Sequence, residues 1–456
     1  MATKERSSFT GKLGFVLAAA GSAVGLGNIW RFPYLAAEYG GGIFLLVYLV
    51  LAVTFGFALM CAEIAIGRKT GLSAVAAFGA LNKKCSWIGY LVSLIPIIIL
   101  PYYSVIGGWV MKYFAVFATG QAHEAASPDF FGEFVSGTAE PLGWFALFLG
   151  VTAMVVLLGV NKGIEKVSKI MMPILVVLSL FIAIYSCFMP GAGEGVKYYF
   201  IPNFSHFSIK TVLAAMGQLF YSMSLAMGIM ITYGSYMKKE VNLESSVRNI
   251  ELFDTGIAFA AGLMVVPSVF SAVATTGGNR EELLVSGPSL MFKTLPFVFD
   301  SMPGGTIVGG LFFLLVIFAA LTSSISLMEA VVSIFDDRFK LGRKACCLLT
   351  LGISVLLGVP SSLGNGVWSN IKLLGMDFLS FFDFISNSVL MPVVALLTCI
   401  FVGYIIKPKA LIEEIEQGGK FKAKHLFTFV IKYFAPICIV AILISSILST
   451  FGIIKL

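Results

Sequence analysis

Several oxygen-bearing side chains stand inside long apolar stretches, where each needs a hydrogen-bonding or ionic partner. Asp254 lies within the apolar run 245–275, and Thr322 and Ser323 lie within the run 305–335. A carboxylate in an apolar environment is costly unless a cation lies beside it or a proton neutralises it. The two hydroxyls add oxygens, or they donate to carbonyls of their own helix. The chemistry that these residue types suit is the binding of a cation by oxygen atoms.

Two apolar runs are interrupted near their middle by small and polar residues. The run 12–37 contains three Gly, a Ser, an Asn and Arg31 within eleven residues, and the run 211–237 contains Gln218, Ser222 and Ser224. Small residues at such spacing also permit close packing of helices, so either run alone is compatible with a packing role. The two runs together indicate interrupted helices.

The composition indicates that the chain lies in a membrane. Of the 456 residues, 58% are hydrophobic and only 12% are charged, against about 25% charged in a typical soluble domain. Apolar runs of 20 residues or more predict spanning helices and exclude the 10-residue alternating strands of a membrane barrel. The chain is therefore expected to be an all-α polytopic membrane protein, with the lipid bilayer as a partner.

Charged and Gly/Pro breaks between the apolar runs predict eleven spans. Of the 31 Lys and Arg residues, 23 fall on one side of these spans and 7 on the other, with Arg31 inside the first span. The positive-inside rule then predicts a plasma-membrane protein with a cytoplasmic N-terminus and an external C-terminus. The predicted spans are 12–37, 41–68, 88–119, 142–159, 166–189, 211–237, 245–275, 305–335, 344–360, 373–405 and 426–454.

The two interrupted spans open two five-helix halves, spans one to five and spans six to ten. Interrupted spans at matching positions are typical of transporters built from an inverted repeat, with the binding site near the membrane midplane. We expect one transporter domain over residues 1–456, with repeat one at about 12–189, repeat two at about 211–405 and an extra helix at about 426–454.

The segment 20–33, which contains Gly25, Gly27, Asn28 and Arg31, resembles the first span of the neurotransmitter:sodium symporter family. Many members have twelve spans, and the absence of the twelfth here bears on contacts between subunits, not on the ten-helix core. The resemblance covers about residues 9–450, and further matches are Gly40–Gly42, Glu63, Gly67–Arg68, Tyr102–Tyr103, 218–224, Thr322–Ser324 and Met376–Phe378.

The resemblance implies two sodium sites at the interrupted helices. A sodium ion shielded from water needs about five or six oxygens, and an unwound helix frees carbonyls for this purpose. The implied ligands of the first ion are the Ala23 carbonyl, Asn28, Ser222 and Asp254. Those of the second are the carbonyls of Gly21, Val24 and Ala319 with the hydroxyls of Thr322 and Ser323.

Asp254 carries a further implication about anions. Chloride-dependent members of the family have an Asn at this position and a Ser four residues later, where this chain has Asp254 and Ala258. The remaining chloride-site positions are matched by Tyr48, Gln218 and Ser222. The carboxylate is thus expected to replace the anion, so that no chloride is required. The alternative is that Asp254 lies at a cytoplasmic helix end near Arg248.

The resemblance also indicates the substrate class. Monoamine transporters of the family have an Asp at the position of Gly25, which contacts the amine. With Gly there, a substrate carboxylate can meet the helix-break amides and the first sodium ion, so an amino acid is expected. The pocket is mostly apolar and lacks an acid or base, which favours neutral, hydrophobic or aromatic substrates. Its implied residues are Ser22, Ala23, Gly25, Leu26, Gly27, Ile99, Tyr103, Tyr221, Ser222, Ser224, Met227, Ser323 and Leu327.

Two charged pairs are implied as gates. Arg31 and Asp377 are expected to flank the site towards the outside, and Arg6 and Asp337 towards the cytoplasm. Asp337 is equally compatible with a solvated charge at a helix end. The sequence does not predict which amino acid is carried, the sodium stoichiometry, proton counter-transport or the oligomeric state.

Other classes of function fit the residues less well. A channel requires a continuous polar lining, whereas the polar residues here gather at one level. An intramembrane hydrolase requires a His-Glu-x-x-His motif, a Ser/His pair or two close aspartates, and Asp254 and Asp377 are expected at different depths. The positive charges are scattered between apolar runs, which argues against nucleic-acid binding. We therefore expect a sodium-coupled symporter and no enzymatic activity.

Overall fold

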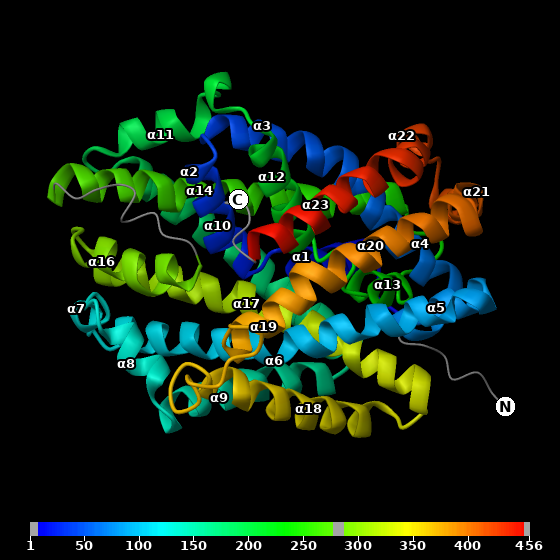
Figure 1. The fold of residues 1–456 in the computed structure, drawn as a ribbon, viewed down its shortest axis with the longest axis horizontal. Helices are drawn as coiled ribbons and strands as arrows, with labels where there is room; N and C mark the ends of the chain where they lie inside the picture. Colours follow the sequence, from blue (N-terminus) through cyan, green and yellow to red (C-terminus); the bar gives the residue numbers. More distant parts are fainter. Residues whose placement is uncertain (1–7, 277–286, 451–456) are drawn as a thin grey trace.

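Long helices that run roughly along one axis make up most of the molecule (Figure 1). The computed structural model describes residues 8–276 and 287–450. Within these residues nine apolar helices are long enough to cross a membrane, and one further span, the first in the chain, is a bent pair. The nine are Gly42–Thr70, Lys83–Ala118, Ala139–Leu157, Val160–Cys187, Leu243–Thr275, Gly305–Phe339, Arg343–Leu363, Phe378–Ile405 and Lys424–Thr450.

Both interrupted spans are broken, as expected. In the first, α1 (Lys12–Ala23) is followed by a π-helical turn at Gly27–Arg31 and by α2 (Phe32–Glu38), and the axis bends by 55°. In the sixth, α12 (Ile209–Ser222) and α13 (Ile229–Gly234) are separated by six non-helical residues. The all-α fold predicted from the apolar runs is confirmed.

The broken spans lie inside the bundle. The α1 helix packs against α10 (Lys166–Cys187), α14 (Leu243–Thr276) and α17 (Gly305–Phe339), and α13 packs against α4 (Phe57–Thr70). Ten of the twelve residues of α1 are buried. A helix that carries polar groups at its break is stable there because its neighbours, not lipid, surround it.

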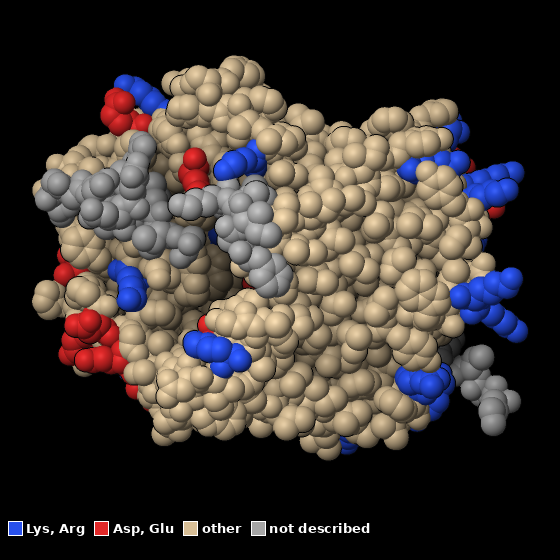
Figure 2. All heavy atoms as spheres, in the orientation of Figure 1, with Lys and Arg blue, Asp and Glu red and all other residues tan. Residues whose placement is uncertain are grey.

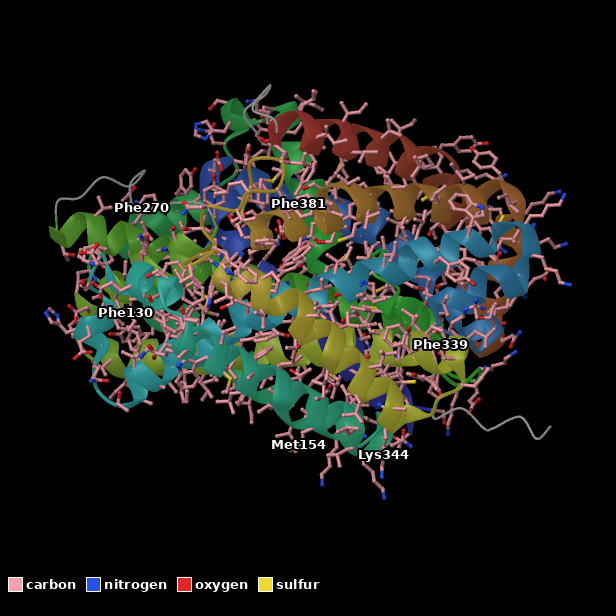
Figure 3. The ribbon with its side chains drawn as sticks, turned by 60° about the horizontal axis from the view of Figure 1, so that its bottom comes forward. Phe130, Met154, Phe270, Phe339, Lys344 and Phe381 are labelled. Carbon is pink, nitrogen blue, oxygen red and sulfur yellow. The ribbon has the colours of Figure 1, made fainter. Side chains whose placement is uncertain are left out.

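The helices at the periphery present apolar side chains outward. In α9 (Ala139–Leu157) and in α22–α23 (Lys424–Phe429 and Ala435–Thr450), only 39% of the most apolar stretch of each span is buried. Met154 on α9 projects from the edge of the molecule (Figure 3), and 64% of its surface is exposed. A contiguous apolar surface of this extent requires lipid as its solvent.

Charged side chains gather at the two ends of the long axis. Figure 2 shows a broad surface without charge between a right-hand end rich in Lys and Arg and a left-hand end that carries both signs. Between the spans lie short helices that the apolar runs do not predict. They are α5 (Ala74–Leu81), α7 (Ala122–Ala125), α8 (Phe130–Ser136), α11 (Ala192–Phe200), α16 (Leu295–Asp300) and α21 (Pro408–Ile415).

Candidate functional site

The break in the first span exposes backbone groups at the centre of the bundle. After Ala23 the chain becomes extended at Val24 and returns to helix at Gly27. Gly25 is required there, because an added Cβ would lie 2.7 Å from Ser323 Oγ and 3.1 Å from the Tyr103 hydroxyl. The Gly27 carbonyl accepts a hydrogen bond of 2.8 Å from the Gln218 amide. The break therefore faces both α17 and α12.

The break in the sixth span has a different backbone. Ser224 and Ala226 have φ values of 52° and 61°, a left-handed conformation that side-chain-bearing residues adopt at some cost. The Ser224 hydroxyl donates to the Ser22 carbonyl at 2.9 Å, which ties the two breaks together. The Ala226 N–H donates to Glu63 Oε1 at 2.6 Å. This carboxylate therefore holds the second break open.

A first group of oxygens, here called the carboxylate cluster, consists of Asn28, Ser222 and Asp254. The Asn28 amide donates to Asp254 Oδ1 at 2.7 Å and to Ser222 Oγ at 2.8 Å, and Ser222 Oγ donates to Asp254 Oδ1 at 2.8 Å. All three side chains are buried. Tyr48 donates to Asp254 Oδ2 at 3.3 Å. Ala23, the fourth expected ligand, ends α1 and is buried.

The alternative placement of Asp254 beside Arg248 is wrong. Arg248 pairs with Glu244 at 2.9 Å and lies over the ring of Phe57. The partners of Asp254 are instead Asn28, Ser222 and Tyr48, so its carboxylate belongs to the carboxylate cluster.

A second group, here called the carbonyl cluster, joins α1 to α17. It consists of the carbonyls of Gly21, Val24 and Ala319 and the hydroxyls of Thr322 and Ser323. Ser323 Oγ lies 3.4 Å from the Gly21 carbonyl and 3.2 Å from the Val24 carbonyl, and donates to the Ser22 carbonyl at 3.0 Å. The Thr322 hydroxyl instead donates within its own helix, to the carbonyls of Phe318 (2.9 Å) and Ala319 (3.1 Å). The expectation that hydroxyls bond within the helix thus holds for Thr322 and not for Ser323.

Both clusters suit a hard cation. In the carbonyl cluster buried oxygens converge, and in the carboxylate cluster the oxygens of Ser222 and Asp254 converge on the Asn28 amide nitrogen. Such oxygens are the ligands that replace the hydration shell of an alkali ion. The carboxylate cluster supplies a formal negative charge, whereas the carbonyl cluster supplies only dipoles. Each cluster therefore offers oxygens of the kind that sodium needs, and a formal negative charge is present only in the carboxylate cluster.

An apolar cavity lies beside the clusters. Its walls combine backbone of the first break with Ile99, Tyr103, Tyr221, Met227 and Leu327, and its volume is about 30 Å³. The cavity lining also includes Ser22, Ala23, Gly25, Leu26, Gly27, Ser224 and Ser323, so the expected pocket residues, apart from Ser222, lie together. Ser222 lies in the carboxylate cluster instead.

A vestibule of about 700 Å³ lies outside this cavity, and the surface is hollowed in the left half of Figure 2. Tyr221 lines both spaces and separates them, with the Arg31 guanidinium 5.7 Å from the centre of its ring. The ring thus forms a floor to the vestibule.

Asp377, of the expected outer pair, lines the vestibule together with Arg31. It caps α19 (Phe378–Asp383) by accepting hydrogen bonds from the Ser380 N–H and hydroxyl. Asp383, which sequence reasoning missed, lies deeper in the vestibule. It accepts hydrogen bonds from Tyr102 and Asn387 and lines the vestibule with Arg31. Its position as an acidic residue within the apolar run 373–405 was the sequence feature that could have identified Asp383 as a functional residue.

The opposite side of the site is packed. The Phe9 ring lies edge-on to Tyr233 and Tyr236, with centroid distances of 5.6 and 6.1 Å. Tyr236 donates to Glu329 at 2.7 Å, and Glu329 pairs with Arg343. Sequence reasoning missed this ion pair, although the buried Glu329 stands in an apolar helix.

The expected inner pair can be followed only in part. Arg6 lies outside the described residues, and Asp337 Oδ2 accepts a hydrogen bond of 2.7 Å from the Ser73 N–H. Asp337 therefore caps the N-terminus of α5.

Comparison with known proteins agrees with this geometry. The family model described as "Sodium:neurotransmitter symporter family" matches residues 6–125 and 139–453. An uncharacterized sodium-dependent transporter of Bacillus subtilis, YhdH, is 34% identical over 98% of both chains, and one of Haemophilus influenzae is 32% identical over 97% of this chain and 98% of its own.

A solved structure supports the same relationship. The crystal structure of MhsT in complex with L-phenylalanine has 38% identity to this chain and a TM-score of 0.86, and the match covers 97% of this chain and 100% of MhsT. These relatives are transporters and not enzymes. The protein described here is accordingly a multi-pass, sodium-dependent transporter, and it belongs to the sodium:neurotransmitter symporter family.

Proposed function

We propose that this protein couples two sodium ions to the uptake of a neutral, hydrophobic or aromatic amino acid by alternating access, without chloride. The observation that carries the proposal is the carboxylate cluster, three buried side chains within 2.8 Å of one another beside the break in the first span. The apolar cavity against the same break supports a substrate that contacts both the backbone and the first ion.

The coupling follows from the position of Gly25. With no side chain there, a substrate carboxylate can approach the amides of the break and complete the coordination of the first sodium ion. Ion and substrate then share contacts, so each raises the affinity for the other by the same factor. A second ion at the carbonyl cluster holds α1 against α17 and favours the same closed arrangement.

The preference for apolar side chains follows from the cavity walls. Ile99, Met227 and Leu327 offer no partner to a charged group, and burying an unpaired charge there lowers affinity by roughly 10³-fold or more. Met227 is adaptable in shape and suits side chains of different outline. MhsT, to which this chain is similar, was crystallised with L-phenylalanine, and this supports an aromatic or large apolar substrate.

Independence of chloride follows from Asp254. The Asp254 carboxylate supplies a permanent negative charge beside the first sodium ion, so that no anion from solution is needed there. Ala258, one turn along α14, offers no hydroxyl for an anion. The hydrogen bond from Tyr48, 3.3 Å from Asp254 Oδ2, falls on the carboxylate instead.

Alternating access requires a closure on each side of the cavity. We assign the outer closure to Tyr221 and Arg31, with Asp383 in the role first expected of Asp377, because Asp377 is engaged by Ser380. We assign the inner closure to the Phe9–Tyr236–Glu329 contacts and to Arg6 with Asp337. The excess of Lys and Arg on one side supports a plasma-membrane protein with a cytoplasmic N-terminus and an external C-terminus.

Binding of radiolabelled L-phenylalanine to the purified protein tests the proposal. We expect saturable binding in sodium that falls to background in potassium or choline, competition by leucine, and no competition by lysine or glutamate. The variant Met227→Phe should shift the preference towards smaller neutral amino acids. Undiminished binding in choline, or equal competition by lysine, would contradict the proposal.

A further inference from the structure

A third cavity lies far from the clusters, at the Lys- and Arg-rich end of the molecule. It is a groove of about 460 Å³ between the end of the tenth span, the start of α21 and the first turns of the eleventh span. This region is orange and red at the upper right of Figure 1. The groove is lined by Tyr404, Lys407, Lys409, Ile412, Thr428 and Lys432, among others.

The groove carries positive charge without a matching acid. The residues that line it include three lysines and no Asp or Glu. Glu413 lies 3.9 Å from Lys409, but both side chains are more than 60% exposed, so this contact compensates little. Within the described part of the chain, no ion pair joins Lys407 or Lys432 to an acid.

Two arginines at this end of the molecule pair with buried carboxylates. Arg68 pairs with Glu414 at 3.0 Å, and Arg343 pairs with Glu329. Both arginines thus have acidic partners within the chain, whereas no acid lines the groove that holds the three lysines, so an anion from outside can neutralise them.

Lys432 lies within the membrane-spanning helix, at a depth where its charge needs an anionic partner. It lies eight residues beyond Lys424, the first residue of the eleventh span, which is a rise of about 12 Å along the helix. Its neighbours Phe429 and Tyr433 are more than half exposed, as is Tyr404, whose hydroxyl donates to the Lys432 carbonyl at 2.7 Å. Exposed aromatic rings and a lysine at this depth are typical of the boundary between headgroups and acyl chains.

We propose that this groove binds the phosphate of an anionic glycerophospholipid from the adjacent leaflet. The phosphate lies between Lys407 and Lys432, with Lys409 at the outer rim. The acyl chains follow the apolar side chains of Ile400 and Ile437, which are 39% and 71% exposed and continue from the groove towards the bilayer centre. A zwitterionic lipid binds less tightly, because its amine adds a fourth positive charge beside the lysines.

The two flanking elements explain what such a lipid does. The groove joins the tenth span to the eleventh, and the connecting α21 is fixed to α4 through Arg68 and Glu414. The lipid therefore replaces a missing acidic side chain in the contact between these spans.

Native mass spectrometry of the purified, delipidated full-length protein tests the proposal. Phosphatidylglycerol, phosphatidylcholine and inorganic phosphate serve as separate probes. The test variant is Lys407→Gln with Lys432→Gln. The matched control is Lys162→Gln with Lys344→Gln, which removes the same charge from exposed lysines. Lys344 lies at the lower edge of Figure 3, away from the red and orange helices.

The wild type and the control should bind phosphatidylglycerol at least tenfold more tightly than phosphatidylcholine. In the test variant the affinity for phosphatidylglycerol should fall about 30-fold, since each lysine near the surface contributes about fivefold. Lys407→Arg with Lys432→Arg should restore binding, which separates loss of charge from misfolding. Equal losses in the test and control variants would overturn the proposal, as would displacement of the lipid by millimolar inorganic phosphate.

Discussion

The carboxylate cluster and the carbonyl cluster border the same break in the first span, yet they are built from different oxygens. The first joins Asn28, Ser222 and Asp254 and contains a formal charge. The second joins α1 to α17 through Ser323 Oγ and uses only hydroxyl and carbonyl dipoles. The first cluster is therefore expected to govern charge balance and substrate coupling, and the second to govern how α1 packs on α17.

Because only the carboxylate cluster carries a charge, the two clusters also depend on a bound ion to different degrees. A buried carboxylate destabilises its surroundings unless a cation or proton accompanies it, so the first cluster depends strongly on its ion. A dipole cluster loses only a few hydrogen-bond-like contacts without its ion. Substitutions at the two clusters should consequently differ in size and in kind.

The largest effect is expected from Asp254→Asn. Removing the charge should raise the sodium concentration for half-maximal L-phenylalanine binding by 100-fold or more, because breaking a buried charge contact costs about 3 kcal/mol or more. Sodium titrations of binding measure this. The control is Glu251→Gln, which removes another buried carboxylate one turn earlier on α14. Equal losses in both variants would show that charge on α14, and not the cluster, is what matters.

Gly25→Ala should have the next largest effect, because this position touches both clusters. Asn28 Oδ1 accepts from the Gly25 N–H at 3.0 Å, and an added Cβ meets Ser323 Oγ. Overpacking of about 1–3 kcal/mol should weaken L-phenylalanine binding roughly 10- to 100-fold. Gly256→Ala, which meets nothing within 4 Å, is the control. Normal affinity in Gly25→Ala would contradict the position assigned to the substrate carboxylate.

Thr322→Val should weaken sodium binding about tenfold, because one neutral oxygen contributes about 1–1.5 kcal/mol. Unlike a change at Asp254, it should not make binding sensitive to chloride. Thr350→Val removes a similar intrahelical hydroxyl bond, from Thr350 to the Cys346 carbonyl, on α18 (Arg343–Leu363). If Thr350→Val lowered the sodium affinity by the same factor, the result would contradict an ion at the carbonyl cluster.

The smallest effect concerns the second break. Ala226→Gly should raise the free energy of unfolding by about 0.5 kcal/mol, since relief of the left-handed conformation outweighs the added chain entropy. Ala261→Gly, within α14, should lower it by about 1 kcal/mol. Thermal unfolding in detergent compares the two variants. A lower stability in both would show that φ at Ala226 carries no strain.

The spans were predictable from sequence because lipid imposes one rule on every stretch of the chain. Twenty apolar residues suffice for a span, so runs such as 305–335 correspond to observed helices. The breaks were predictable for the same reason, since Asn28 and Arg31 in an apolar run require partners. Short helices such as α21 were not predicted, because their faces are set by distant contacts such as that of Arg68 with Glu414.

The outer pair shows where the sequence was insufficient. Asp377 and Asp383 lie six residues apart and both line the vestibule with Arg31, and their hydrogen-bond partners depend on where α19 begins. The helix begins at Phe378, so Asp377 becomes its cap and turns to Ser380. The spacing of Asp377 and Ser380 was a capping signal in retrospect.

Uptake of L-phenylalanine into proteoliposomes, with a sodium gradient and either chloride or gluconate as the anion, tests the central role of Asp254 most directly. The wild type should transport equally well in both media, because its compensating charge is built in. Asp254→Asn with Ala258→Ser should transport only in chloride, since the anion then replaces the missing carboxylate. A wild type that stops in gluconate would contradict the role assigned to Asp254.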